Sequence, residues 1–490
     1  MRPLPPDRLV GWLATAGVTL LAGVLRFWHL SQPHGKIFDE VYYANDAHKM
    51  LLNGVEPTKA GTSDGFVVHP PLGKWIIGLG EKMLGFNESG WRVMAAVFGT
   101  LTVLVLIRTA RRMTGSTLLG CVAGLLLALD GLHLVFSRTA LLDGFLTFFI
   151  VVAFACLVAD RDDGRRRLAD RLEDNTDDAG PGLGLRWWRL ASAVSLGAAC
   201  SVKWSGIFFV LLFPLLAFAW DVGARRTAGI QHPLTATFRR DVLPALGMFV
   251  VLVPLVYTAS WSGWFLSDNG WDRHYADVYN DHWPLVPDAI RSWLHYHRAI
   301  LHFHMHLGDN PKDNHPYMSH PIGWLVLARP VAFFYSSPKG VAMGCHAVKG
   351  CSREVLGVGT PAIWWASIPA LVLMGWYWIS RRDWRAGAVL ACFLFAFVPW
   401  IVSDINGRIM FNFYALPCLP FMILAITLVL GRVLGPADAD DTRRTWGAVA
   451  SGAYLLVVVL NFFYLYPVLV AKVISYDHWR HLMWLNNNWI

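Results

Sequence analysis

Residues 242–261 read Val-Leu-Pro-Ala-Leu-Gly-Met-Phe-Val-Val-Leu-Val-Pro-Leu-Val-Tyr-Thr-Ala-Ser-Trp, a stretch without a charged side chain. A helix of about 20 apolar residues crosses the ~30 Å hydrocarbon core of a bilayer. Similar windows recur along the 490-residue chain, of which 55% is hydrophobic and only 16% is charged. A soluble globule of this composition would expose large apolar patches, so the sequence predicts an all-α polytopic membrane protein.

Windows of this kind define about eleven predicted membrane helices. They cover residues 10–30, 93–110, 116–135, 139–159, 188–203, 204–221, 242–261, 361–379, 386–403, 411–434 and 445–468. The first window has a longer apolar core than a signal peptide, and no small-residue cleavage site precedes Pro33. We therefore expect a single membrane domain over residues 1–490, with the first helix retained.

Arginines outside the predicted helices indicate the orientation of the chain. The loops assigned to the inner face contain no lysine and carry Arg108, Arg111, Arg112, Arg161, Arg165, Arg166, Arg167, Arg225, Arg226, Arg239, Arg240, Arg381, Arg382, Arg385, Arg443 and Arg444. Because basic loops favour the cytoplasmic side, this pattern predicts a cytoplasmic N-terminus and places loops 31–92 and 262–360 outside. The net charge of +8 therefore reflects topology, and we expect no nucleic-acid partner.

Two of the predicted loops have distinctive compositions. Residues 160–187 combine mixed charges with Asp, Gly and Pro, which predicts a flexible inner loop. The large outer loop contains Cys345 and Cys351, whereas the other five cysteines fall in predicted spans. In an oxidising compartment these two residues are candidates for a disulfide, and the alternative is a pair of free thiols.

Residues 41–52 and 289–305 have the pattern of amphipathic helices lying on the outer membrane surface. The second of these segments would cover the cavity described below. It belongs to a region that carries His295, His297, His302, His304 and His306. Their spacing could assemble a metal site, but no cysteine or fixed ligand pattern accompanies them. We expect no metal, and histidines that face solvent or the acceptor.

Ionisable residues concentrate at the predicted outer ends of the helices. They are Arg26, Asp39, Glu40, His69, Lys74, Arg92, Arg138, Asp143, Lys203 and Arg408. Any single cation among them could be a snorkelling or paired helix-end residue. A carrier or lipid flippase is an alternative of another class, but transporters more often place such residues at the membrane centre. Gathered at one face, the ten residues predict an outer cavity that contains acids and several cations.

Such a cavity suits a sugar carried on a lipid phosphate. Cations would hold the phosphate, and a carboxylate would take the proton from an incoming hydroxyl. Arg and Lys would also stabilise the charge that grows on the leaving phosphate. The residues therefore favour glycosyl transfer at the outer face of the membrane.

Several short motifs, read in order, resemble those of the protein O-mannosyltransferases, whose members have a GT-C type membrane fold. The motifs are Phe38-Asp-Glu, His69-Pro-Pro-Leu-Gly-Lys74, Arg92 with Ala95-Ala-Val-Phe-Gly99, Leu129-Asp130, Ser137-Arg-Thr-Ala-Leu-Leu-Asp143, Ser201-Val-Lys-Trp-Ser-Gly206, Gly359-Thr-Pro-Ala-Ile-Trp-Trp365 and Gly407-Arg408 with Tyr414-Ala-Leu-Pro417. The chain departs from the family at Phe411-Asn-Phe, where members often carry histidines. Loop 262–360 is also too short for the β-trefoil domain of the eukaryotic members.

The resemblance implies that mannose is transferred, with inversion, from a polyprenyl phosphate to Ser or Thr hydroxyls of proteins. The setting implied is the outer face of a bacterial, specifically actinobacterial, plasma membrane. Asp39 matches the catalytic base and Glu40 the second acid, while Arg26 and Arg92 would hold the active loop or the donor. The remaining residues implied in donor binding or support of the site are His69, Lys74, Arg138, Asp143, Lys203 and Arg408.

The implied partners are the polyprenyl-phosphate-mannose donor, a Ser/Thr-containing polypeptide, membrane lipids and the protein translocon, and no cofactor is required. An alternative within the same fold moves a lipid-linked sugar to a glycolipid or a cell-wall polymer. The transfer of sugar to a Ser/Thr peptide separates the two alternatives.

Overall fold

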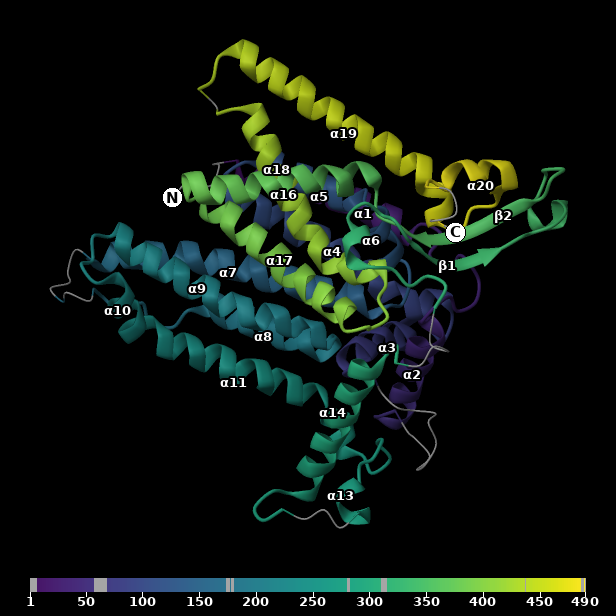
Figure 1. The fold of residues 1–490 in the computed structure, drawn as a ribbon, viewed down its shortest axis with the longest axis horizontal. Helices are drawn as coiled ribbons and strands as arrows, with labels where there is room; N and C mark the ends of the chain where they lie inside the picture. Colours follow the sequence, from purple (N-terminus) through teal and green to yellow (C-terminus); the bar gives the residue numbers. More distant parts are fainter. Residues whose placement is uncertain are drawn as a thin grey trace.

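A computed structural model of the chain describes residues 7–56, 68–172, 177, 180–279, 283–309, 315–436, 438–485 and 489. In this part of the chain nine helical segments are long and apolar enough to cross a membrane, and most of them run side by side (Figure 1). They are α1 (Arg8–Phe27), α4 (Glu88–Thr114), α7 (Leu142–Leu172), η1 (Trp204–Gly206) with α9 (Ile207–Thr227), α10 (Pro233–Thr237) with η2 (Phe238–Val242) and α11 (Leu243–Ser260), α16 (Pro361–Arg381), α17 (Trp384–Ile405), η5 (Asn412–Cys418) with α18 (Leu419–Leu434), and α19 (Asp441–Leu469). The all-α membrane fold class is confirmed.

Two of the eleven predicted spans form helices that are too short to belong to these nine segments. Residues 116–135 form α5 (Thr117–Ala128) and α6 (Gly131–Phe136), with a break at Asp130. The carboxylate of Asp130 explains the break, because Oδ1 accepts from the backbone N–H of His133 at 2.9 Å and so caps α6. Residues 188–203 correspond to α8 (Trp187–Val202). The expected number of eleven membrane helices therefore stays a prediction.

Shorter elements collect at the ends of the bundle. One end carries the helices α2 (Glu40–Asn53), α3 (Leu72–Leu84) and α14 (Asp288–His306), whereas the N-terminus and α10 lie at the other (Figure 1). The segments predicted as amphipathic helices, 41–52 and 289–305, correspond to α2 and α14. The other short helices are α12 (Ser262–Leu266), α13 (Tyr275–Val278), α15 (Pro321–Trp324), η4 (Val341–Met343) and α20 (Tyr476–Leu482).

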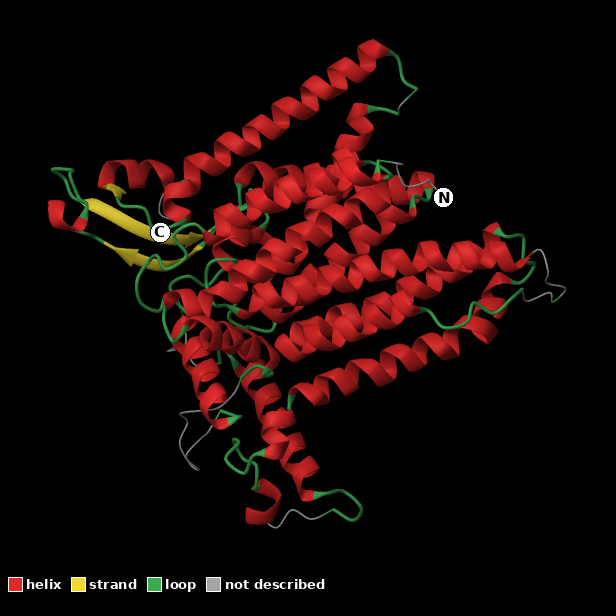
Figure 2. Ribbon diagram, turned by 180° about the vertical axis from the view of Figure 1, so that it is seen from behind, coloured by secondary structure: helices red, strands yellow, loops and turns green. Residues whose placement is uncertain are grey.

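A small antiparallel sheet, which the sequence analysis did not predict, projects beside α20 and the end of α19 (Figure 2). Its strand order is β1 (Val331–Ser336), β2 (Cys351–Gly357) and β3 (Ile474–Ser475). The register of β1 and β2 runs from Val331 opposite Gly357 to Ser336 opposite Arg353. Cys345 and Cys351 form a disulfide with a Cα–Cα distance of 5.7 Å, which closes part of the connection between these strands.

The helices differ widely in how much of their surface is buried. The η5–α18 segment buries 83% of its apolar window, and Leu416, Leu419 and Met422 are fully buried. The α19 window buries only 22% and the α10–α11 window only 11%. α18 is therefore central in the bundle, while α11 and α19 leave most of their apolar surface to the surrounding lipid.

Helix α7 continues into the segment that was predicted to be a flexible inner loop, residues 160–187. It remains helical as far as Leu172. The cause is a buried charge cluster: Asp160 accepts from Arg186 Nε at 2.8 Å and from Arg189 Nε at 2.9 Å. Arg189 Nη2 also donates to Asp221 in α9 at 2.8 Å. This cluster joins α7, α8 and α9, so the first part of the expected loop is ordered.

We predict that Asp160→Asn destabilises the protein by about 3–5 kcal/mol, because it leaves buried arginines without a full set of charged partners. Asp163→Asn is the matched control, since Asp163 pairs with Arg167 at 2.8 Å on the half-exposed side of the same helix. Such a pair contributes only about 0–1 kcal/mol. Thermal unfolding of the purified full chain in detergent measures both changes. Equal unfolding temperatures for the two variants would contradict the prediction.

Candidate active site

A cavity of about 1040 Å³ opens at the end of the bundle that carries α2, α3 and α14. Its ionisable and histidine side chains are Asp39, Asp46, Lys49, Glu56, His69, Lys74, Lys203, His304 and Arg408. Its aromatic side chains are Tyr42, Tyr43, Trp204, Phe208, Phe303, Trp400 and Tyr414. The cavity thus combines charged groups with aromatic walls.

Asp39 lies at the N-terminus of α2 and lines this cavity. The residue before it, Phe38, has a φ of +46°, a backbone conformation that costs free energy for a bulky residue. Aromatic packing holds that conformation, because the Phe38 ring stacks on Phe333 of β1 with 4.6 Å between centroids. The Phe38 ring also makes an edge-to-face contact with Phe413, with 5.8 Å between ring centroids. The direction in which α2 begins, and with it the place of Asp39, is therefore set from outside the cavity.

The surroundings of Asp39 make its carboxyl group more basic than usual. Burial is the largest cause and, against the opposing field of Lys203, raises the pKa of Asp39 to about 6, with a smaller contribution from the negative charge of Asp143. A carboxylate with a pKa near the working pH is ionised yet basic enough to accept a proton. Asp39 has the properties of a general base.

Glu40 does not line the cavity, although it follows Asp39 directly. Its Oε1 accepts from Arg92 Nε at 2.8 Å and from the backbone N–H of Ala140 at 2.9 Å. Its Oε2 accepts from Arg92 Nη2 at 2.8 Å and from the N–H of Ile37 at 3.0 Å. Both charged side chains are fully buried. The predicted catalytic role of Glu40 stays a prediction; in this structure its carboxylate is held by Arg92 and two backbone N–H groups.

Arg92 extends this network to the chain between α1 and α2. Its Nη1 donates to the carbonyl of Pro33 at 2.8 Å and its Nη2 to that of Gly35 at 2.9 Å. The guanidinium therefore binds the loop before Asp39, and the prediction that Arg92 holds the active loop or the donor stays a prediction.

Arg26 and Arg138 lie outside the cavity. Arg138 was predicted to contact phosphate, but its Nη1 donates to the carbonyls of Arg26 at 2.9 Å and Trp28 at 2.7 Å, at the C-terminal end of α1. Those carbonyls have no partner within the helix, which explains why a cation lies there. Arg26 Nη2 donates to His133 Nδ1 at 2.8 Å and thereby joins α1 to α6.

Lys203 and Arg408 are the cations that line the cavity on the side of Tyr414. The chain leaves α8 at Lys203 in an extended conformation, and its Nζ lies 2.9 Å from both carboxylate oxygens of Asp143. Lys203 Nζ and the Arg408 guanidinium lie 4.9 Å and 5.4 Å from the centre of the Tyr414 ring. Both cations thus face one aromatic wall, where an anionic group would be held.

Lys74 is occupied by two acids that the sequence analysis missed. Its Nζ donates to Asp46 Oδ2 at 2.9 Å and to Glu56 Oε1 at 2.5 Å. Burial raises the pKa of Glu56 to about 7, although Lys74 opposes the shift. Asp46 was detectable, because it lies seven residues after Asp39 and therefore on the same face of α2. Glu56 follows α2, and no pattern in the sequence indicates it.

His69 and His304 meet in the cavity, with 5.4 Å between their ring centroids. His304 Nε2 donates to the carbonyl of Val68 at 3.2 Å. Burial lowers the pKa of His69 far below its ordinary value and that of His304 to about 4, so both rings are neutral. Among the residues that the structure describes, no group of three or more His, Cys, Asp or Glu side chains could hold a metal ion.

Comparison with known proteins identifies the family. Residues 16–261 match the family described as dolichyl-phosphate-mannose-protein mannosyltransferase, and residues 289–489 match the C-terminal four-transmembrane region of protein O-mannosyltransferase. The polyprenol-phosphate-mannose–protein mannosyltransferase of Mycobacterium tuberculosis is 43% identical over 98% of this chain and 92% of its own length. The enzymes with the same name from Mycolicibacterium smegmatis and Corynebacterium glutamicum are 41% and 36% identical over 98% and 95% of this chain, and over 93% and 91% of their own lengths.

Solved structures share the fold. The Saccharomyces cerevisiae protein O-mannosyltransferase Pmt1-Pmt2 complex, bound to the sugar donor, superposes with a TM-score of 0.75 over 98% of this chain and 93% of that one, at 14% identity. ArnT from Cupriavidus metallidurans gives a TM-score of 0.52 over 94% and 77%, at 16% identity. The GT-C fold is confirmed, and the chain belongs to the protein O-mannosyltransferase family.

Proposed function

We propose that this protein transfers mannose from a polyprenyl phosphate to Ser or Thr hydroxyls of polypeptides, with Asp39 as the base. The relatives that match almost the full chain are named for this reaction. The observation that carries the assignment is a partly buried carboxylate of raised pKa, Asp39, in one cavity with Lys203 and Arg408. That arrangement pairs a proton acceptor with an anion clamp, which transfer from a glycosyl phosphate requires.

The reaction would proceed in one displacement. The carboxylate of Asp39 takes the proton from the acceptor hydroxyl, while the oxygen of that hydroxyl attacks the anomeric carbon of mannose. The bond between that carbon and the phosphate oxygen breaks, and polyprenyl phosphate leaves with the electron pair. Lys203 and Arg408 stabilise the charge on the phosphate. Attack opposite to the leaving group inverts the anomeric centre, and no covalent enzyme intermediate is formed.

The proposed setting is a bacterial plasma membrane, with a cytoplasmic N-terminus and the cavity on the outer face. This orientation is supported by the arginine-rich loops at the end of the bundle opposite Asp39. The acceptor would then be a secreted or membrane polypeptide that emerges from the translocon. Lys203 and Arg408 supply the charge stabilisation within the protein, so the proposal includes no metal.

We predict that Asp39→Asn lowers kcat about 100- to 10,000-fold and leaves donor binding intact, because the amide cannot accept the proton. Transfer of radiolabelled mannose from polyprenyl phosphate to a Thr/Pro-rich peptide, in membranes with equal amounts of protein, measures the loss. Asp268→Asn is the control, since it makes the same chemical change at an exposed outer position. Equal transfer by wild type and Asp39→Asn would remove the assigned role. Transfer to glycolipid without transfer to peptide would favour the other acceptor class.

Glu40→Gln is predicted to act through folding of the site. It weakens the buried pair with Arg92 at a cost of about 3–5 kcal/mol, so the unfolding temperature and kcat should fall together. Thermal unfolding in detergent and the peptide transfer assay give the two values. An unchanged unfolding temperature with transfer abolished would instead place Glu40 in the chemistry.

The pH dependence of kcat/KM should follow the ionisation of Asp39. Below about pH 6 the carboxyl group holds its proton and cannot act as a base, so transfer should rise with a midpoint near 6. Lys203→Gln removes a positive charge that lowers the pKa of Asp39, so its midpoint should move to higher pH. Lys472→Gln, at an exposed outer position, should leave the midpoint in place. A Lys203→Gln midpoint that stays fixed or falls would contradict this assignment.

A further inference from the structure

A second cavity, of about 240 Å³, lies at the opposite end of the bundle from Asp39. Helix α4 connects the two regions: Arg92 near its start binds Glu40, and Thr114 at its end lines the second cavity. At 1.5 Å per residue, these two positions are roughly 33 Å apart along the helix, about the thickness of the hydrocarbon core. The second cavity therefore lies at the other membrane surface and takes no part in the proposed transfer.

The charges that line this cavity are mainly positive. Arg385, Arg432 and Arg443 stand against one acid, Asp383. Arg385 already occupies that acid, because its Nε donates to Asp383 Oδ1 at 2.9 Å and its Nη2 to Oδ2 at 2.5 Å. Arg432 makes only a longer contact with Oδ2, at 3.3 Å. The lining therefore carries two positive charges that the acid does not neutralise.

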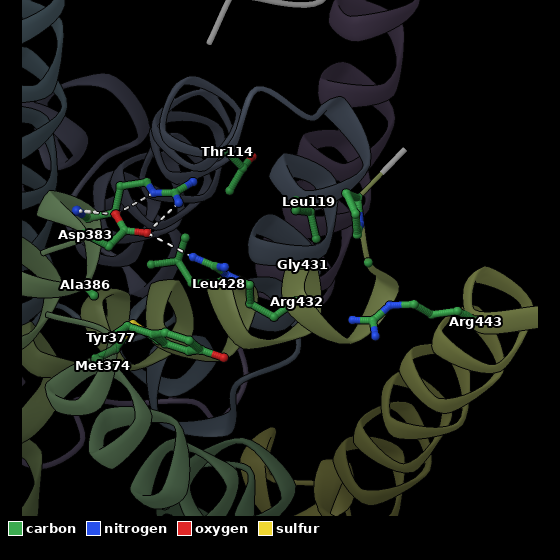
Figure 3. Close-up of a pocket in the computed structure, with 13 residues that line it drawn as sticks. Thr114, Leu119, Met374, Tyr377, Asp383, Ala386, Leu428, Gly431, Arg432 and Arg443 are labelled. Carbon is green, nitrogen blue, oxygen red and sulfur yellow. Dashed lines mark hydrogen bonds and ion pairs between the residues drawn. The ribbon is translucent and has the colours of Figure 1, made fainter. Parts of the chain in front are cut away.

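Arg432 of α18 and Arg443 of α19 both line this cavity, and the Arg432 side chain is directed toward Asp383 (Figure 3). In Figure 3 the Arg443 side chain extends from α19 toward α18, and Arg432 projects from α18 beside Tyr377. Arg443 can lie close to the end of α18 because Gly435 has no side chain; a Cβ there would lie 3.0 Å from Arg443 Nε. Within the described parts of the chain, the Arg443 guanidinium has no hydrogen-bond or ion-pair partner.

Apart from Thr114 and Tyr377, the rest of the lining is apolar, with Leu119, Met374 and Leu428 beside the arginines. Helix α19 buries only 22% of its apolar window, so hydrocarbon chains can reach its surface next to the cavity. Basic pockets between membrane helices at the cytoplasmic side are typical sites for anionic lipid headgroups. We propose that this cavity binds the phosphate of an anionic phospholipid through Arg432 and Arg443, with the lipid chains along the exposed surface of α19.

Lipid retention by the purified full chain tests the proposal. Native mass spectrometry after equal additions of phosphatidylglycerol and phosphatidylcholine should show preferential retention of phosphatidylglycerol by the wild type. Arg432→Gln with Arg443→Gln should reduce that retention about thirtyfold, since two cationic contacts are lost. Arg226→Gln with Arg239→Gln is the matched control, because it removes two exposed arginines elsewhere at the same end and should leave retention unchanged.

Two further measurements separate a binding site from a folding effect and a lipid from free phosphate. Arg432→Lys with Arg443→Lys keeps the positive charge and should keep most of the phosphatidylglycerol retention. The unfolding temperature of every variant, measured in phosphatidylcholine, should stay close to that of the wild type. Wild type without lipid preference, or an equal loss in the control, would overturn the proposal. Inorganic phosphate binding that the Gln variant loses, without retained lipid, would overturn the lipid assignment.

Discussion

The ion pair between Glu40 and Arg92 joins a long apolar helix, α4, to the helix that begins beside the candidate active site, α2. Arg92 lies near the start of α4, and Glu40 is the first residue of α2. Both side chains are fully buried, and the same guanidinium holds the carbonyls of Pro33 and Gly35. Removing either partner would leave a charge without compensation in a region that water does not reach. The position of the intervening loop therefore depends on this pair.

The Glu40–Arg92 pair fixes the direction of the Asp39 side chain, although Asp39 does not take part in the pair. Successive residues of a helix project about 100° apart, so a buried Glu40 directs its neighbour toward a different surface. The two acids of one motif consequently have unequal surroundings: Glu40 receives four hydrogen bonds, and Asp39 faces the cavity near Lys203. The cations divide in the same way. Contacts with backbone carbonyls or side chains outside the cavity are made by Arg26, Arg92 and Arg138. The cavity itself is lined by Lys203 and Arg408.

Hydropathy was sufficient for the fold class and for the approximate place of the nine described segments that are long enough to cross a membrane, because lipid imposes one dominant constraint on such segments. It did not reveal that α7 extends to Leu172, since a polar segment can be ordered by a distant buried acid such as Asp160. The short strands β1 and β2 were missed because their pairing crosses a 14-residue connection. Motif position located Asp39, but it could not distinguish a guanidinium that binds phosphate from one that caps a helix, as Arg138 does. Glu56 could be recognised as a residue of the site only from the structure, where its Oε1 lies 2.5 Å from Lys74 Nζ.

The stacking of Phe38 on Phe333 limits which parts of this fold can vary in sequence. Strand β1 is packed against the residue that precedes Asp39, so its aromatic face has little freedom to vary. The connection that follows is different, because Val341, Met343 and Val348 are all more than 60% exposed. Exposed connections of this kind tolerate inserted sequence better than the elements they join. An additional domain could therefore be accommodated between β1 and β2 while the carboxylate of Asp39 keeps its place.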